Sequence, residues 1–287
     1  MKKHQKIWYI CIIALVALAV FTTLFFSYRC ISQYGQQTSI SSDPKEDVSD
    51  QQISEPSYEE QIPSNAYRLD KFFEIDGIRY YEDMKFSGVP GIDVSSYQQQ
   101  IDWQQVKEAG IEFAIIRAGY RGWSSGKLDQ DDCFTRHVEG ALDAGIDVGV
   151  YFFSQALTPE EAAEEAQYTL AMIEQYDISG PIVFDWEEVD AADARTNEMN
   201  MLMLTSCADA FCRVVSDAGY QACVYFNQAY GYEQFNLVSL EEYDFWLAEY
   251  NEIPSFVYDF QIWQYSNEGQ VPGIEGNVDL NIMFKQK

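Results

Sequence analysis

The segment 181–188, Pro-Ile-Val-Phe-Asp-Trp-Glu-Glu, ends an apolar run in carboxylates. Side chains alternate between the two faces of a strand, so Asp185 and Glu187 are predicted to share a face, with their Cα atoms roughly 7 Å apart. Such a pair can have its pKa values driven apart, which leaves one carboxyl protonated and the other ionised. Glycosidic bond cleavage requires this arrangement. Acidic strand ends are also common in ordinary solvated loops, so the motif alone fits both interpretations.

Histidine is scarce in this chain, which has only His4 and His137. His4 precedes an apolar run, and His137 falls in a predicted helix, where we expect a surface or half-buried position. No nucleophile signature accompanies it, which disfavours Ser-His-Asp and Cys-His sites. The sequence has neither H-E-x-x-H nor C-x-x-C, so we expect no metal and no cofactor. Carboxylates and tyrosines remain for acid–base chemistry.

The N-terminus has the pattern of a membrane anchor. Three lysines within residues 1–6 precede twenty uncharged residues, 7–26, a stretch long enough to cross a bilayer. Positive charge before the span predicts a cytoplasmic segment 1–6, a transmembrane signal anchor at 7–28 and an extracellular catalytic part. The alternative is a cleaved signal peptide and a secreted protein, although no small-x-small site precedes the polar segment.

The charge of the chain limits its partners. The first 29 residues hold four of the 18 basic residues and none of the 46 acidic ones, which leaves 14 bases against 46 acids. Such a surface repels nucleic acid and anionic lipid headgroups, so we expect no nucleic-acid partner. Neutral or cationic polymers are more compatible with it, although high charge also serves solubility alone.

Pattern changes along the chain divide it into segments. Residues 29–65 are polar and poor in large apolar residues, which is typical of a disordered linker. Residues 66–89 contain Asp76-Gly77 between aromatic and β-branched runs, which predicts a small hairpin-like extension. From residue 90 to 287, strand and helix patterns alternate. Expected strands are 91–94, 113–120, 148–154, 182–186, 222–227, 245–250, 260–265 and 278–284; expected helices are 102–109, 134–144, one from Thr158 onward, and 199–218.

Five strand–helix units followed by helix-poor strands predict an irregular α/β barrel of the TIM type, because such repeats form parallel strands with right-handed crossovers. Polar residues collect where the strands end, and in barrels this rim is the catalytic face. These residues are Asp93, Tyr120, Ser154, Asp185, Glu187, Asn227, Glu249 and Gln264.

Several ordered motifs resemble one known family. They are Gly91-Ile92-Asp93-Val94-Ser95-Ser96-Tyr97-Gln98 with Ile101-Asp102-Trp103, Ala114 to Tyr120, Gly149 to Phe153, Asp185-Trp186-Glu187, Phe245 to Ala248, Ile262 to Tyr265, and Gly276-Asn277-Val278-Asp279. Together, over residues 90–285, they resemble glycoside hydrolase family 25, the Chalaropsis-type lysozymes or N-acetylmuramidases. The resemblance implies a flattened (β/α)5(β)3 barrel, in agreement with the strand–helix pattern.

The same resemblance implies an activity and a site. The expected reaction is hydrolysis of the β-1,4 bond between N-acetylmuramic acid and N-acetylglucosamine, with peptidoglycan glycan strands as the partner. By motif, Glu187 is the expected general acid/base and Asp185 its partner carboxylate, while Asp93 and Asp279 complete an acidic floor. Net retention is expected. Asp185 then either attacks as a nucleophile or orients the substrate's acetamido group, which attacks in its place; the second route is favoured.

Further residues are candidates for substrate binding. Tyr120, Tyr151 and Trp263 are expected to stack on sugar rings, although aromatic residues are more often core. Arg117 is expected to pair with an acid of the floor and hold it ionised. Two alternatives remain for the function: another glycosidase such as a chitinase-like enzyme, and a non-catalytic glycan-binding module. Val183 and Pro181 stand where a chitinase has further acids, and a binding module has no need of both Asp185 and Glu187.

Overall fold

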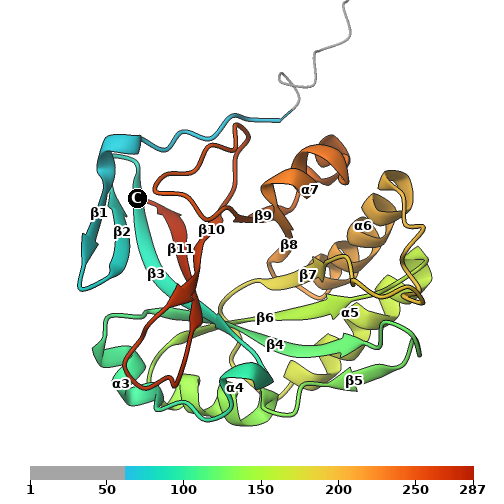
Figure 1. Ribbon diagram of the computed structural model, residues 1–287, viewed down its shortest axis with the longest axis horizontal. Coiled ribbons are helices and arrows are strands. Elements are labelled where there is room, and N and C mark those ends of the chain that lie inside the picture. The colour runs from blue at the N-terminus through green and yellow to red at the C-terminus, as the bar shows by residue number, and fades with distance from the viewer. Residues whose placement is uncertain (1–61) are drawn as a thin grey trace, which may run out of the picture. The chain divides into compact units, whose positions relative to one another are not determined.

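Eight strands close into a barrel in the part of the chain that the structure, a computed structural model, describes: residues 62–287 (Figure 1). The barrel strands are β3 (Phe86–Val94), β4 (Phe113–Arg121), β6 (Asp147–Ser154), β7 (Ile182–Trp186), β8 (Ala222–Asn227), β9 (Asp244–Ala248), β10 (Ile262–Gly269) and β11 (Val278–Gln286). Neighbours from β3 through β4 and β6 to β10 are parallel. Strand β11 closes the ring, antiparallel to both β10 and β3.

Five helices follow the first five barrel strands. They are α3 (Trp103–Glu108), α4 (Phe134–Asp143), α5 (Pro159–Ile173), α6 (Met201–Asp217) and α7 (Gln228–Glu233). In this described stretch, β9, β10 and β11 follow one another with no α-helix between them. The predicted order of five strand–helix units and three strands is therefore confirmed, although no helix had been assigned after the fifth strand, where α7 lies. A short strand, β5 (Leu128–Gln130), pairs with the end of β4 and was not predicted.

Two helices begin where the sequence indicates. The Thr158 hydroxyl accepts from the Glu161 amide and Pro159 occupies the first position of α5, while the Asp102 carboxylate accepts from the Gln105 amide at α3. These caps satisfy amides that have no partner within the helix.

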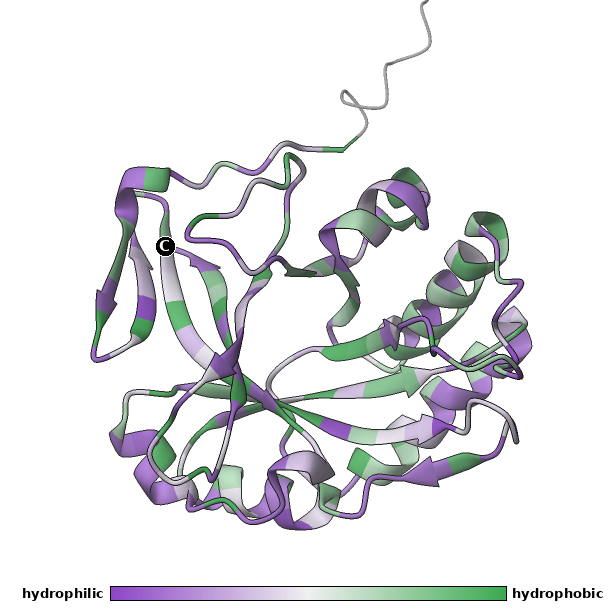
Figure 2. Ribbon diagram, in the orientation of Figure 1, coloured by the Kyte–Doolittle hydropathy of each residue, from purple (hydrophilic) through white to green (hydrophobic). Residues whose placement is uncertain are grey.

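The core has two layers, because each barrel strand alternates between an inner and an outer face. The outer layer joins strands to helices; Figure 2 shows β6 and β7 as largely hydrophobic and the helices as mixed. The inner layer holds Phe113, Ile115, Val183 and Trp246 among others. On β7, Val183 belongs to this inner layer and Ile182 and Phe184 to the outer one. Asp185 thus continues the inner face toward the carboxyl end of the barrel.

His137 on α4 departs from expectation. It is fully buried rather than half-exposed, its ring lies edge-on against Trp103, and its Nε2 lies 3.0 Å from the Gln99 carbonyl oxygen. Burial lowers its pKa, so the neutral ring is favoured. The position is structural, because its contacts are with the outer layer of the barrel.

A hairpin extends the sheet beyond the barrel. Strands β1 (Phe72–Ile75) and β2 (Ile78–Glu82) are joined by Asp76 and Gly77, whose φ angles of 52° and 82° are those of the tight turn that Asp-Gly favours. Strand β2 pairs with β3. Residues 62–65, assigned above to the disordered linker, are instead ordered: Ile62 is buried and the Asn65 amide donates to the Val257 carbonyl. Burial of this isoleucine explains the difference.

The predicted cytoplasmic segment 1–6, the anchor 7–28 and the linker as far as residue 61 lie outside the described residues. Within residues 62–287, no helix combines the length and apolarity needed to span a bilayer.

Candidate active site

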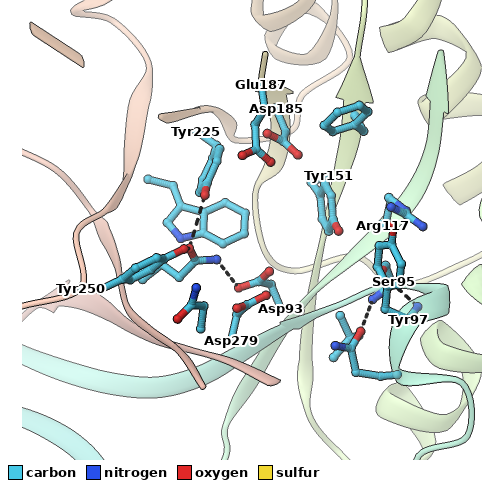
Figure 3. A pocket seen from close by; sticks show the side chains of 16 residues that line it. Asp93, Ser95, Tyr97, Arg117, Tyr151, Asp185, Glu187, Tyr225, Tyr250 and Asp279 are labelled. Atoms are coloured by element: carbon cyan, nitrogen blue, oxygen red, sulfur yellow. Dashed lines mark hydrogen bonds between the residues drawn. The ribbon is translucent and has the colours of Figure 1, made fainter. Parts of the chain in front are cut away.

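A cavity of about 450 Å³ opens at the carboxyl ends of the barrel strands (Figure 3). All four carboxylates expected from the sequence, Asp93, Asp185, Glu187 and Asp279, line it. Asp93, Asp185 and Asp279 lie on β3, β7 and β11, and Glu187 directly follows β7. The three strands reach one cavity because the barrel closes. The tertiary fold thus brings four acids into one cleft, where the charges of neighbouring acids disfavour ionisation of Asp93, Asp185 and Glu187.

Asp185 is the deepest acid of the β7 pair. Its side chain is 4% exposed, and no described residue hydrogen-bonds to its Oδ1. Burial raises its pKa well above the usual value, the charges of Glu187 and Asp93 add to this, and Arg117 opposes it. A buried acceptor without a donor costs free energy. Asp185 is therefore ready to accept a hydrogen bond from a group that enters the cleft.

Glu187 follows the end of β7 and reaches solvent at the mouth of the cavity. Desolvation by the cleft nevertheless raises its pKa, with a further contribution from Asp279. The next residue, Glu188, does not line this cavity, and its Oε2 accepts from the Tyr230 hydroxyl at 3.4 Å. The two adjacent glutamates thus have different surroundings, and only Glu187 faces the other acids.

Gln155 holds the backbone of Glu187 from behind. Its fully buried side-chain amide donates to the carbonyl oxygens of Glu187 at 2.9 Å and Ser154 at 2.8 Å. Its Oε1 accepts from the Thr196 hydroxyl at 2.8 Å, and its own carbonyl accepts from Arg195 at 3.1 Å. These bonds tie the end of β6 to the loop after β7. No pattern in the sequence indicated this positioning role.

We expect Gln155→Leu to lower kcat by roughly tenfold and to destabilise the fold by about 1–3 kcal/mol, because it leaves buried polar groups without partners. Steady-state kinetics and urea unfolding measure the two effects. The matched control is Gln104→Leu, since Gln104 is exposed and its side-chain amide donates to Glu108 on its own helix, away from the cavity lining. Unchanged kcat in Gln155→Leu would contradict the positioning role.

Asp93 and Asp279 form a second pair on the cavity floor. They are directly opposite in the β3–β11 register, and Oδ1 of Asp93 accepts from Asn281 at 2.7 Å and Gln264 at 2.8 Å. Burial raises the pKa of Asp93 well above its usual value, and the charge of Asp279 raises it further. Burial also raises the pKa of Asp279, while its hydrogen bond with Asp93 opposes that shift. The pair is therefore expected to share one proton.

Aromatic residues form the wall beside this pair. The Trp246 indole donates to Asn281 at 2.8 Å, and the hydroxyls of Tyr250 and Tyr225 donate to Gln264 at 2.8 and 3.3 Å. All three aromatic residues line the cavity (Figure 3). Trp246 and Tyr250 were not singled out from the sequence. Strand alternation could have found Trp246, because it is two residues from Ala248 on the inner face of β9.

The expected binding residues are placed differently. Tyr151 and Arg117 line the cavity, whereas half-buried Tyr120 lies beside Arg117 and outside the lining. The expectation for Trp263 is wrong: this side chain is fully buried in the outer layer, where its indole donates to the Glu249 carbonyl at 2.8 Å. Its neighbour Gln264 faces the cavity instead, because adjacent strand residues point to opposite faces.

Arg117 also has a partner other than the one expected. It pairs with Asp131 at 2.7 Å rather than with an acid of the floor. Asp131 is 1% exposed and follows β5, the strand that the sequence pattern did not reveal. Within residues 62–287, no three His, Cys, Asp or Glu side chains converge in a way that could hold a metal ion.

The raised carboxyl pKa values lead to a pH dependence. A general acid acts in its protonated form, so a raised pKa of Glu187 keeps it active to higher pH, and activity falls as pH rises through that value. We expect kcat/KM to show a basic limb between roughly pH 5 and 8. The limb belongs to the coupled acids as a group. A pH–rate profile without a basic limb in that range would contradict the assignment of Glu187.

Comparisons with known proteins agree with this geometry. The family model described as Glycosyl hydrolases family 25 matches residues 92–274. The autolytic lysozyme of Clostridium acetobutylicum is 27% identical over 192 residues, 67% of this chain and 54% of that protein. Lysozyme M1 of Streptomyces globisporus is 30% identical over 207 residues, 68% of this chain and 67% of that protein. A crystal structure of a bacterial lysozyme from Streptomyces coelicolor has a TM-score of 0.54 at 26% identity, covering 70% of this chain and 93% of that one. The chain spans about half the length of the Clostridium relative.

Proposed function

The chain belongs to glycosyl hydrolases family 25, and on that premise we propose that it is a peptidoglycan hydrolase, a lysozyme that cleaves the β-1,4 bond between N-acetylmuramic acid and N-acetylglucosamine. The observation that carries the proposal is the pair at the end of β7. Asp185 and Glu187 line one cleft, and burial together with the charge of Glu187 raises the pKa of Asp185, so the two carboxyls lose their protons in separate steps and one stays protonated while the other is ionised. Two carboxyl groups in such surroundings are what glycoside hydrolysis needs.

In the proposed mechanism, Glu187 donates its proton to the bridging O4 of the departing N-acetylglucosamine. The C1–O4 bond breaks as the acetamido oxygen of the muramic acid residue bonds to C1, which gives a cyclic oxazolinium ion. Glu187, now ionised, takes a proton from water, and the water oxygen bonds to C1 as the ring opens. Two displacements at C1 give net retention.

Asp185 has a defined role in this route. The acetamido N–H donates to its Oδ1, the atom that lacks a partner among the described residues. The carboxylate then orients the acetamido oxygen toward C1 and stabilises the positive charge that develops on the ring. Direct attack by Asp185 is the alternative. It would leave a covalent glycosyl–Asp185 ester that the acetamido route does not form.

Product analysis tests the proposed activity. The full-length protein is incubated with isolated peptidoglycan, and the new reducing ends of the released fragments are identified. Muramic acid ends support the proposed bond specificity, and N-acetylglucosamine ends point to another glycosidase. Binding without release would place the protein among non-catalytic glycan-binding modules.

We also propose that residues 7–28 anchor the protein in the cell membrane, with the N-terminus inside and the barrel outside. The support is the run of twenty uncharged residues behind three lysines. Alkaline extraction of membranes tests this, together with protease treatment of cells stripped of wall. An anchored protein stays in the membrane fraction and loses its barrel to the protease. Recovery of a shortened, soluble chain would indicate cleavage and secretion instead.

A further inference from the structure

One cation lies within this acidic cleft. Of the described residues that line the cavity, Arg117 alone carries a positive charge, whereas Asp93, Asp185, Glu187 and Asp279 are acidic (Figure 3). Arg117 extends from the inner face of β4, two residues beyond Ile115 of the inner layer. Its side chain is 15% exposed. It is therefore largely desolvated, yet it remains in contact with the space that substrate would occupy.

The guanidinium is held firmly along one edge. Nε donates to Oδ2 of Asp131 at 2.7 Å, and Nη2 donates to the Ser96 hydroxyl at 2.9 Å. Asp131 is itself fixed, because its carboxylate also accepts from the backbone amides of Ser96 and Cys133. A planar guanidinium fixed in this way is preorganised to receive a ligand.

The remaining donors are open. Nη1 has no hydrogen-bond partner among residues 62–287, and the guanidinium carbon lies 5.4 Å from the centre of the Tyr97 ring. Tyr97 lines the cavity and is 84% exposed, and the centre of the Tyr120 ring lies 5.8 Å from the same carbon. The two rings contact the guanidinium without supplying a hydrogen-bond acceptor for Nη1. Pairing with the buried Asp131 carboxylate explains why Nε and Nη2 of Arg117 lie where they do. It does not account for the open donors in a substrate cleft.

Substrate chemistry indicates what these donors meet. N-acetylmuramic acid differs from N-acetylglucosamine only in a lactyl ether at O3, which ends in a carboxyl group. C3 is the ring carbon next to C2, which carries the acetamido group proposed to contact Asp185. Arg117 acts electrostatically on Asp185, and on Tyr151 of the cavity lining. Arg117 and Asp185 line the same cavity, so a substituent on C3 of a sugar bound at Asp185 projects into the space that also contains this cation.

We propose that Arg117 binds the carboxyl oxygen of this lactyl group and so selects N-acetylmuramic acid over N-acetylglucosamine beside Asp185. The inference rests on the proposed function and adds the residue that recognises the substrate. When a stem peptide is attached, the carboxyl is an amide, whose carbonyl oxygen still accepts a hydrogen bond. The aromatic wall of Trp246, Tyr225 and Tyr250 carries no cation and suits a sugar without this substituent.

Two matched substrates test the proposal: peptide-free glycan strands with the lactyl carboxylate intact, and the same strands after chemical reduction of that carboxylate to an alcohol. We expect the full-length wild-type protein to have a kcat/KM roughly 10- to 100-fold higher on the first. Arg117→Gln should bring this ratio close to one, and Arg117→Lys should leave it intermediate. Arg79→Gln is the matched control, because Arg79 lies over Trp263 and Tyr265, outside the cavity lining, and should keep the wild-type ratio.

The outcomes separate three cases. A lower kcat/KM on both substrates by the same factor in Arg117→Gln would mean that Arg117 only supports the fold through Asp131, and would overturn the inference. Arg117→Lys keeps a charge for Asp131 and provides the test if Arg117→Gln fails to fold, as judged by thermal unfolding. Equal cleavage of both strands by the wild type also overturns the inference while leaving the proposed hydrolase intact. Cleavage of neither strand would overturn both.

Discussion

Glu187→Gln is expected to lower kcat on peptidoglycan by about 10²- to 10⁴-fold, the usual contribution of a general acid–base residue. Glutamine keeps the size of the side chain and its place at the end of β7 but has no proton to give to the departing oxygen. The other residues that line the cavity are unchanged, so affinity for wall fragments should persist. Steady-state kinetics and a pelleting assay with insoluble peptidoglycan measure the two properties separately.

The adjacent Glu188 provides the control for this experiment. Glu188→Gln removes the same charge one residue away, at a side chain that contacts Tyr230 and does not line the cavity. We expect its kcat to stay within about twofold of wild type, as for most surface substitutions. Equal losses in the two variants would show that local charge, rather than proton donation by Glu187, determines the rate.

Asp185→Asn is the second substitution with a large expected effect, a loss in kcat of about 10²- to 10³-fold, comparable to removal of one oxyanion-hole donor. Asparagine is isosteric but neutral, so it cannot balance the positive charge that develops on the oxazolinium ring. Its amide N–H₂ also presents a donor where the acetamido N–H needs an acceptor. The measurement is kcat on peptidoglycan, with Asp190→Asn, an exposed acid in the following loop, as control.

The same residue separates the two retaining routes. If the acetamido group is the nucleophile, mass spectrometry of the wild-type protein quenched during turnover should find no sugar attached to Asp185. Isolation of a glycosyl–Asp185 adduct would overturn the acetamido route and assign the attack to the carboxylate. Asp185→Asn is expected to lose activity by either route, so the presence or absence of the adduct, and not the rate, distinguishes the two routes.

Local patterns in the sequence were sufficient for the order of the barrel strands and of the first four helices, whereas β5 and α7 were missed. Alternation on β7 predicted that Asp185 and Glu187 share a face, and Asp76-Gly77 predicted the hairpin turn. Thr158 and Asp102 marked helix starts because their side chains satisfy amides only a few residues away. All these signals act over short stretches of chain, so the sequence alone carries them. The motifs from Gly91 to Asp279 identified the resemblance to a family, and this resemblance assigned the four carboxylates to one site.

Contacts between distant segments were decided by the closed barrel. Antiparallel pairing of β11 with β3 places Asp279 opposite Asp93, although 186 positions in the sequence separate them. Asp131, which directly follows β5, pairs with Arg117, so Arg117 does not pair with an acid of the floor. Gln155 after β6 donates a hydrogen bond to the carbonyl oxygen of Glu187 after β7. The position of Trp263 near a strand end favoured a place in the cavity. Adjacent strand residues point to opposite faces, so Gln264 faces the cavity and Trp263 lies in the outer layer.

The sequence by itself therefore determined which residues could perform the chemistry and on which strands they lie, since strand periodicity and helix capping are local. Only the tertiary structure decided which carboxylates lie beside one another in the cleft, which side chain holds the backbone of Glu187, and how Arg117, the cation among the described lining residues, is fixed. Those properties depend on burial and on distances between segments far apart in the chain. The same burial raises the pKa of Glu187, the general acid of the proposed reaction.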